Sequence, residues 1–145
     1  MKVVLQRVRS ASVSVNGEKV AGIERGYLLL LGIAAGDTTE QAKRMAQQIT
    51  KARLFPDAEG KMQSSILDIQ GEILVVSQFT LLADFAKGNR PSFHQAAKPE
   101  MAKPLCDFFV EELSQVLGRK IPTGVFGADM QVQLVNDGPV TIVFE

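Results

Sequence analysis

The sequence predicts a single α/β domain, residues 1–145, in which two main helices pack on a mixed, strongly curved and barrel-like β-sheet. Segments with the alternating apolar pattern of strands are interleaved with two segments of helical periodicity, in the order β-β-β-α-β-α-β-β. Apolar residues make up 46% of the chain and charged residues 22%, and no linker or low-complexity segment divides it. A chain of this length and composition can bury a normal core.

The first three strands are predicted from their apolar patterns. Residues 2–15, KVVLQRVRSASVSV, alternate apolar and polar side chains over much of their length, as a half-buried strand does. Asn16-Gly17 then predicts a two-residue hairpin turn into a strand near residues 18–23. Residues 26–33, GYLLLLGI, are apolar on both faces, which predicts a central strand covered on both sides.

Two amphipathic helices follow from the 3.6-residue period. The first is predicted over residues 38–55, with Asp37 and Glu40 as an N-cap pair. The second is predicted over residues 99–117, where Pro99 suits the first turn. Pro104 lies inside this range and should bend or delay the helix.

The remaining strands carry the two least ordinary motifs. Residues 73–82 are strand-like but are interrupted by the polar pair Ser77-Gln78. The segments GADMQVQLV and PVTIVFE predict two last strands, joined at residues 136–141, NDGPVT. On spacing alone this junction is a hairpin turn, although Pro139 removes a backbone donor where the next strand should begin pairing.

Charge and cysteine content exclude several classes of function. Sixteen Lys and Arg balance sixteen Asp and Glu, which argues against a protein that wraps a nucleic-acid duplex but permits contact with one short end. The single cysteine allows no intrachain disulfide, and Arg7 and Arg9 interrupt the apolar stretch that a signal peptide requires. We therefore expect a cytoplasmic protein with no membrane contact. One His and one Cys also speak against a metal site of the usual zinc type.

Familiar catalytic sets are missing from the sequence. His94 is the only histidine available as a base, and its polar context, PSFHQ, favours a surface position. Cys106 lies beside the apolar face of the second helix and is typical of a small buried hydrophobe. No glycine-rich phosphate loop is present, so we expect no cofactor.

The polar residues within VVSQFTLLAD leave two interpretations open. The strand can simply bend, with Ser77 and Thr80 bonding to nearby backbone. Alternatively, the bend presents backbone N–H groups and the Gln78 amide to a reacting carbonyl, as an oxyanion hole does. Thr80 is then a candidate nucleophile, although the sequence offers it no evident base.

SQFTL at residues 77–81 and NDGPVT together resemble the two signature motifs of the D-aminoacyl-tRNA deacylase (D-tyrosyl-tRNA deacylase) family. The segments LQRVRSASVSVNG, RLFPDAEGKM, GNRPSF and GVFGADMQVQLVNDGPVT also resemble that family in order and spacing. The SQF and NDGPV residues fit its standard bacterial and eukaryotic branch. The resemblance implies a cytoplasmic homodimer without metal or cofactor that hydrolyses the ester joining a D-amino acid, or glycine, to the 3′-terminal ribose of tRNA.

The resemblance also implies roles for individual residues. The catalytic motif comprises Ser77, Gln78, Phe79 and Thr80. Gly138 and Pro139, joined by a cis peptide bond, reach into the active site of the other subunit, where their carbonyls reject L-amino acids. Arg7 braces this pair across the interface. The pocket for the amino acid or terminal adenosine is lined by Ala102, Phe126 and Met130. The cluster of Lys87, Arg90, Lys98 and Lys103 is compatible either with contacts to a few tRNA phosphates near this site or with an ordinary solvated loop.

Two mechanisms and two other functions remain open at this point. In the first mechanism Thr80 is a nucleophile that forms an acyl-enzyme. In the second the ribose 2′-hydroxyl helps to activate water, and we favour this second mechanism because Thr80 has no evident base. The alternative functions are a threonine-nucleophile esterase or amidase acting on small molecules, and a non-catalytic dimeric interaction module.

Overall fold

A computed structural model describes all 145 residues, and its strands and helices follow the predicted order. The chain begins with β1 (Lys2–Val15), β2 (Glu18–Ile23) and β3 (Gly26–Gly32), followed by α1 (Thr39–Lys51). Next come the short strands β4 (Arg53–Pro56) and β5 (Met62–Ser65), then β6 (Glu72–Ser77) and the 3-10 turn η1 (Phe79–Leu82). The chain ends with α2 (Pro99–Leu117) and β7 (Gln131–Phe144).

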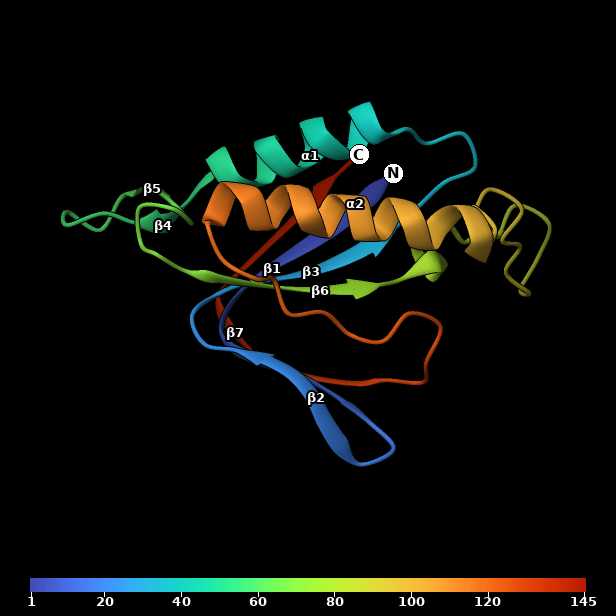
Figure 1. Cartoon of the computed structure of the whole chain (residues 1–145), viewed down its shortest axis with the longest axis horizontal. Coiled ribbons are helices and arrows are strands. Elements are labelled where there is room, and N and C mark those ends of the chain that lie inside the picture. Colours follow the sequence, from blue (N-terminus) through green and yellow to red (C-terminus); the bar gives the residue numbers. More distant parts are fainter.

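Strand β1 organises the main sheet because it has three neighbours. Along one edge it pairs antiparallel with β3 through residues 2–8 and with β2 through residues 11–15. Along the other edge it pairs antiparallel with β7, whereas β3 and β6 are parallel. One long strand shared between two successive partners curls the mixed sheet into a half-barrel, and both helices lie on the same side of it (Figure 1). The predicted fold class is confirmed.

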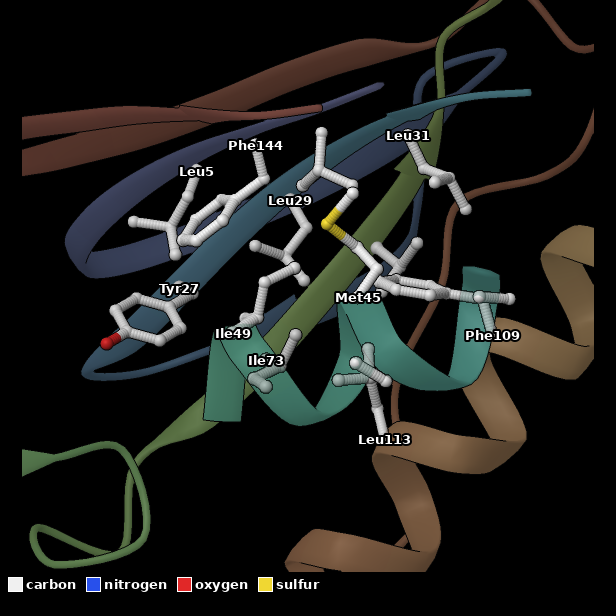
Figure 2. Close-up of a cluster of buried hydrophobic side chains, with 14 of the residues drawn as sticks. Leu5, Tyr27, Leu29, Leu31, Met45, Ile49, Ile73, Phe109, Leu113 and Phe144 are labelled. Carbon is white, nitrogen blue, oxygen red and sulfur yellow. The ribbon is translucent and has the colours of Figure 1, made fainter. Parts of the chain in front are cut away.

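The main core lies between the sheet and the two helices (Figure 2). It contains 21 buried residues, among them Leu5 and Leu29 from the sheet, Met45 and Ile49 from α1, and Phe109 from α2. A second cluster of seven residues covers the other face of the sheet and includes Leu28 and Leu74. Strand β3 is therefore buried on both faces, as its unbroken apolar sequence predicts.

Helix α1 is shorter than predicted. Its N-cap is Thr38, whose hydroxyl accepts the Gln41 N–H at 3.2 Å while the Gln41 side chain accepts the Thr38 N–H at 2.8 Å. Asp37 instead accepts the Ala34 N–H at 2.7 Å and closes the preceding loop. The helix ends at Lys51, so Phe55, predicted at the helix end, lies in β4. Backbone pairing of β4 with β5 explains the difference, since helical periodicity cannot reveal that contact.

Helix α2 has the predicted bounds, and it continues through Pro104 without a delayed start. Its buried face consists of Ala102, Leu105, Cys106, Phe109 and Leu113. Neither of the two helices combines the length and the apolarity needed to cross a membrane.

The C-terminal segment differs from the local turn prediction. Residues 131–136 and 141–144 both pair with β1, so they are two halves of one strand rather than the arms of a hairpin. Between the pairs Gln6↔Thr141 and Val8↔Asn136, the four residues 137–140 lie opposite one residue, Arg7. DGPV, residues 137–140, therefore forms a bulge in a long strand. The turn-forming residues are used for this bulge, because β1 is long enough to pair on both sides of it.

Candidate active site

A cavity of about 530 Å³ opens where β3 and β6 end. Parallel strands finish at the same edge of a sheet, so this edge presents Leu31 of β3 beside Ser77 of β6. The first turns of α2 and the segment after residue 125 supply the opposite walls. Its 18 lining residues are Leu31, Ile33, Val76, Ser77, Gln78, Phe79, Phe93, Ala96, Ala97, Lys98, Pro99, Ala102, Cys106, Phe126, Gly127, Ala128, Met130 and Val132.

The SQFT motif forms a bend tied to the sheet. The Gln78 N–H donates to the Leu31 carbonyl at 2.7 Å, which extends the β3–β6 pairing by one bond. The first hydrogen bond of η1 then runs from the Leu81 N–H to the Gln78 carbonyl at 3.2 Å. The N–H groups of Phe79 and Thr80 precede that bond and so have no partner within the turn. Of the amides in this motif, these two remain available to a ligand, whereas that of Gln78 is occupied.

The glycine at the end of β3 lets this bend pack against the strand. A Cβ atom on Gly32 would lie 2.6 Å from Cδ2 of Leu82 and 3.0 Å from the Gln78 carbonyl oxygen. Any larger residue would therefore push η1 away from β3. The side chains of the motif are also linked, since the Gln78 amide nitrogen donates to the Thr80 hydroxyl.

Thr80 has no base within hydrogen-bonding distance. Its hydroxyl accepts from the Gln78 amide, which cannot take up a proton at neutral pH, and no titratable side chain bonds to it. The only histidine lies outside the cavity: His94 contacts the Ser92 hydroxyl at 2.9 Å and Asp84 at 3.9 Å, and its side chain is 61% exposed. Thr80 itself is exposed beside the cavity and does not line it.

The cavity wall is predominantly apolar. Ala102 and Cys106 project from the buried face of α2, and Phe126 and Met130 come from the segment that leads into β7. Burial raises the pKa of the Cys106 thiol to about 11, so this cysteine is a neutral wall residue at physiological pH. Apolar walls with a few polar groups at one end suit a ligand that has one reactive polar centre.

One aromatic cavity residue, Phe93, was not anticipated from the sequence. Its ring contacts the ring of Phe79 edge-on, with centroids 4.9 Å apart. Lys98, which the sequence named only as a phosphate contact, brings a cation to the wall at the start of α2. Phe93 lies in the loop between η1 and α2, where neither periodicity nor residue type marks an inward-facing position. The aromatic residue in GNRPSF was the only available signal.

The other predicted site residues form a separate group. Gly138 and Pro139, joined by a cis peptide bond, lie in the bulge of β7 against Arg7. The Arg7 Nε donates to the Asp137 carbonyl at 3.0 Å, and this side chain is almost fully buried. Arg7 pairs with Tyr27 near the start of β3, whereas Leu31 adjoins the cavity at its end. These two positions of β3 are four residue steps apart, roughly 13 Å.

Of the ten predicted residues, the fold thus gathers six around the cavity: Ser77, Gln78, Phe79, Ala102, Phe126 and Met130. Thr80 lies beside them. Arg7, Gly138 and Pro139 do not face the cavity of their own chain.

Comparison with known proteins identifies the family. Residues 4–145 match the family D-Tyr-tRNA(Tyr) deacylase, which is nearly the whole chain. The chain belongs to this family. A D-aminoacyl-tRNA deacylase of Flavobacterium johnsoniae is 51% identical over 145 residues, covering 100% of this chain and 97% of that protein. One of Chlorobaculum tepidum is 52% identical with the same coverage. The family inferred from SQFTL and NDGPVT is confirmed.

Solved structures share the whole fold of this deacylase-family member. A c-Myc DNA Unwinding Element Binding Protein superposes with a TM-score of 0.95 at 46% identity, over 100% of this chain and 98% of that one. A probable eukaryotic D-amino acid tRNA deacylase gives a TM-score of 0.87 at 18% identity, over 99% and 97% of the two chains. The second comparison bears on the fold alone.

Proposed function

We propose that this chain is a cytoplasmic D-aminoacyl-tRNA deacylase, which hydrolyses the ester between a D-amino acid, or glycine, and the 3′-terminal ribose of tRNA. The observation that carries the proposal is the apolar cavity closed at one end by the SQFT bend, in a chain of this family. The cavity accepts the aminoacyl-adenosine end, and the bend meets the ester carbonyl.

The bend stabilises the charge that develops on the ester. When a water oxygen bonds to the carbonyl carbon, an electron pair moves to the carbonyl oxygen, and its return breaks the bond to the ribose 3′-oxygen. The backbone N–H groups of Phe79 and Thr80 and the side-chain amide of Gln78 donate to that oxyanion. One such donor changes a rate by about 10²–10³-fold. The bond between the Gln78 backbone N–H and the Leu31 carbonyl fixes the bend, and so these donors, before the substrate binds.

The substrate supplies the proton transfer. Thr80 has no base to deprotonate it, so the ribose 2′-hydroxyl beside the ester helps to activate the water, and the 3′-oxygen leaves as a hydroxyl. The Thr80 hydroxyl then positions the Gln78 amide, to which it is bonded, and forms no acyl-enzyme.

Chirality is read by the Gly138–Pro139 segment of a second copy of the chain. The roughly 13 Å between Arg7 and the cavity-facing end of β3 keeps the segment from its own cavity, which supports a homodimer in which each protomer completes the other's site. The Gly138 and Pro139 carbonyls face the substrate Cα and hold its ammonium group. An L side chain would collide with this backbone, a D side chain points away, and glycine passes because it has no side chain.

The tRNA is held only near its acceptor end. Lys98 at the cavity wall and the exposed Lys87 and Arg90 of the preceding loop are placed to meet phosphates there. Lys103 is less available than its sequence context suggests, because its ammonium group lies 2.8 Å from Asp107. A few phosphate contacts are compatible with a net charge of zero.

The substrate class is tested by comparing D-tyrosyl-tRNA with D-tyrosine methyl ester. The methyl ester has neither an adenosine to fill the cavity nor a 2′-hydroxyl, so we expect rapid hydrolysis of the tRNA ester and little of the methyl ester. Comparable rates on both would indicate a threonine-nucleophile esterase acting on small molecules. Hydrolysis of neither would leave a non-catalytic dimeric module.

A further inference from the structure

Arg7, which contacts the bulge that holds Gly138 and Pro139, is itself held in place by other residues. Arg7 is anchored on the short hairpin β4–β5, which lies outside the main sheet. Its Nη1 donates to the Leu54 carbonyl at 2.6 Å. Its guanidinium carbon lies 5.8 Å from the centroid of the Phe55 ring, within the range of a cation–π interaction.

Phe55 is a fixed platform for this contact. Its side chain is fully buried, and the ring of Tyr27 stacks on it with centroids 5.2 Å apart and planes 24° from parallel. The guanidinium of Arg25 lies 5.2 Å from the same centroid. A ring held by these contacts has little freedom to move, so it restricts the positions that the Arg7 guanidinium can take.

Arg7 transmits this position to the bulge. Its Nε donates to the Asp137 carbonyl at 3.0 Å and lies 3.5 Å from the Asp137 carboxylate. A Cβ atom on Gly138 would lie 3.2 Å from Nη2, so the guanidinium sits directly against the Gly138 backbone. Residues 137–140 have no pairing partner in β1. In this unpaired segment, the bond from Arg7 to the Asp137 carbonyl therefore takes the place of a sheet hydrogen bond.

We propose that Phe55 is a positioning residue for chiral selection: it holds Arg7, and through Arg7 it sets where the Gly138–Pro139 carbonyls stand. The inference rests on the proposed role of that segment. Phe55 does not line the cavity, and its effect appears in the choice between D and L substrates rather than in the rate of the chemical step.

A pair of matched substitutions tests the proposal. Phe55→Leu keeps an apolar side chain but removes the aromatic face, whereas Phe109→Leu makes the same change at an equally buried position of the same core cluster, away from Arg7. The ratio of kcat/KM for D-tyrosyl-tRNA to that for L-tyrosyl-tRNA is measured for each variant, with the unfolding midpoint as the readout of stability. Arg7→Lys serves as the positive comparison.

We expect both leucine variants to lower the midpoint, and only Phe55→Leu to lower the D/L ratio, by about tenfold, chiefly through faster hydrolysis of the L substrate. Arg7→Lys should act in the same direction. An unchanged ratio in Phe55→Leu, or an equal loss in Phe109→Leu, overturns the proposal. If a leucine variant does not fold, the pair Phe55→Met and Phe109→Met decides in the same way, because unbranched Met fills irregular core space. Wild-type protein without D/L preference would instead refute the proposed function.

Discussion

At the scale of single residues, the site depends on which polar groups are free and which are occupied. The Gln78 backbone N–H is used by Leu31, and one N–H of the Gln78 side-chain amide is directed to Thr80. The remaining donors are the second N–H of that side chain and the backbone amides of Phe79 and Thr80, which no strand or turn uses. The motif's residue types suggested an oxyanion hole. Which amides form it depends on the contact with β3, which only the fold reveals.

Thr80→Ala should keep activity within about tenfold of wild type, because Thr80 only orients Gln78, whereas Gln78→Ala should lose about 10²–10³-fold. Single-turnover deacylation of D-tyrosyl-tRNA measures both. Thr80→Ser is the control that keeps the hydroxyl. Loss of nearly all activity in Thr80→Ala, with full activity in Thr80→Ser and an intact fold, would favour the acyl-enzyme mechanism.

Cys106 should react slowly with thiol reagents while the protein is folded. With its pKa raised to about 11 by burial, only about 0.1% is thiolate at pH 8, far less than for an ordinary thiol of pKa about 8.5. The folded state favours the protonated thiol, so the raised pKa of Cys106 contributes to the free energy of unfolding. This contribution is fully present below the ordinary thiol pKa and is lost as the pH rises through about 11. The rate at which a chromogenic disulfide labels Cys106 is measured in the native and in the denatured protein. Equal labelling rates in the two states at pH 8 would contradict this prediction.

At the scale of elements, the sequence predicts what depends on local pattern and misses what depends on pairing. The bounds of β1, β2 and α2 follow from periodicity and turn residues, and the structure confirms them. Hairpin β4–β5 depends on backbone pairing between two short neighbouring segments, and the continuity of β7 depends on its pairing with the distant strand β1. Asn, Asp and Gly mark a local change of direction, but they do not say whether the chain reverses or bulges.

Pro104 should make α2 less stable than the same helix with alanine at this position. Proline removes one N–H and crowds the carbonyl of the fourth residue before it, here Glu100. Pro104→Ala should therefore raise the free energy of unfolding by about 1–3 kcal/mol, measured by urea denaturation. Gln115→Ala, at an exposed position of the same helix, should change it by well under 1 kcal/mol. A destabilised Pro104→Ala variant would show that the proline is required by the packing of the helix start.

At the scale of the whole molecule, the proposed function requires two chains to complete one site. The cavity and the Gly138–Pro139 bulge lie at opposite ends of β3 within one chain, so one protomer contains both parts but cannot bring them together. The sequence motifs name both parts, while their separation emerges only from strand register.

A heterodimer of two variants tests this division. In a purified dimer of Gln78→Ala with Arg7→Met, the only active cavity belongs to the Arg7→Met protomer, and it receives the intact bulge of its partner. We expect this heterodimer to reject L-tyrosyl-tRNA, whereas the Arg7→Met homodimer hydrolyses it. Hydrolysis of the L substrate by the heterodimer at half the homodimer rate would mean that each bulge acts within its own chain.

The most direct test of the central claim is deacylation of matched D- and L-tyrosyl-tRNA by the purified wild-type protein. The rigid backbone that we assign to the filter excludes an L side chain by collision, so we predict that the D substrate is hydrolysed at least about 10²-fold faster. Equal rates on the two substrates, or no hydrolysis of the D form, would contradict the account.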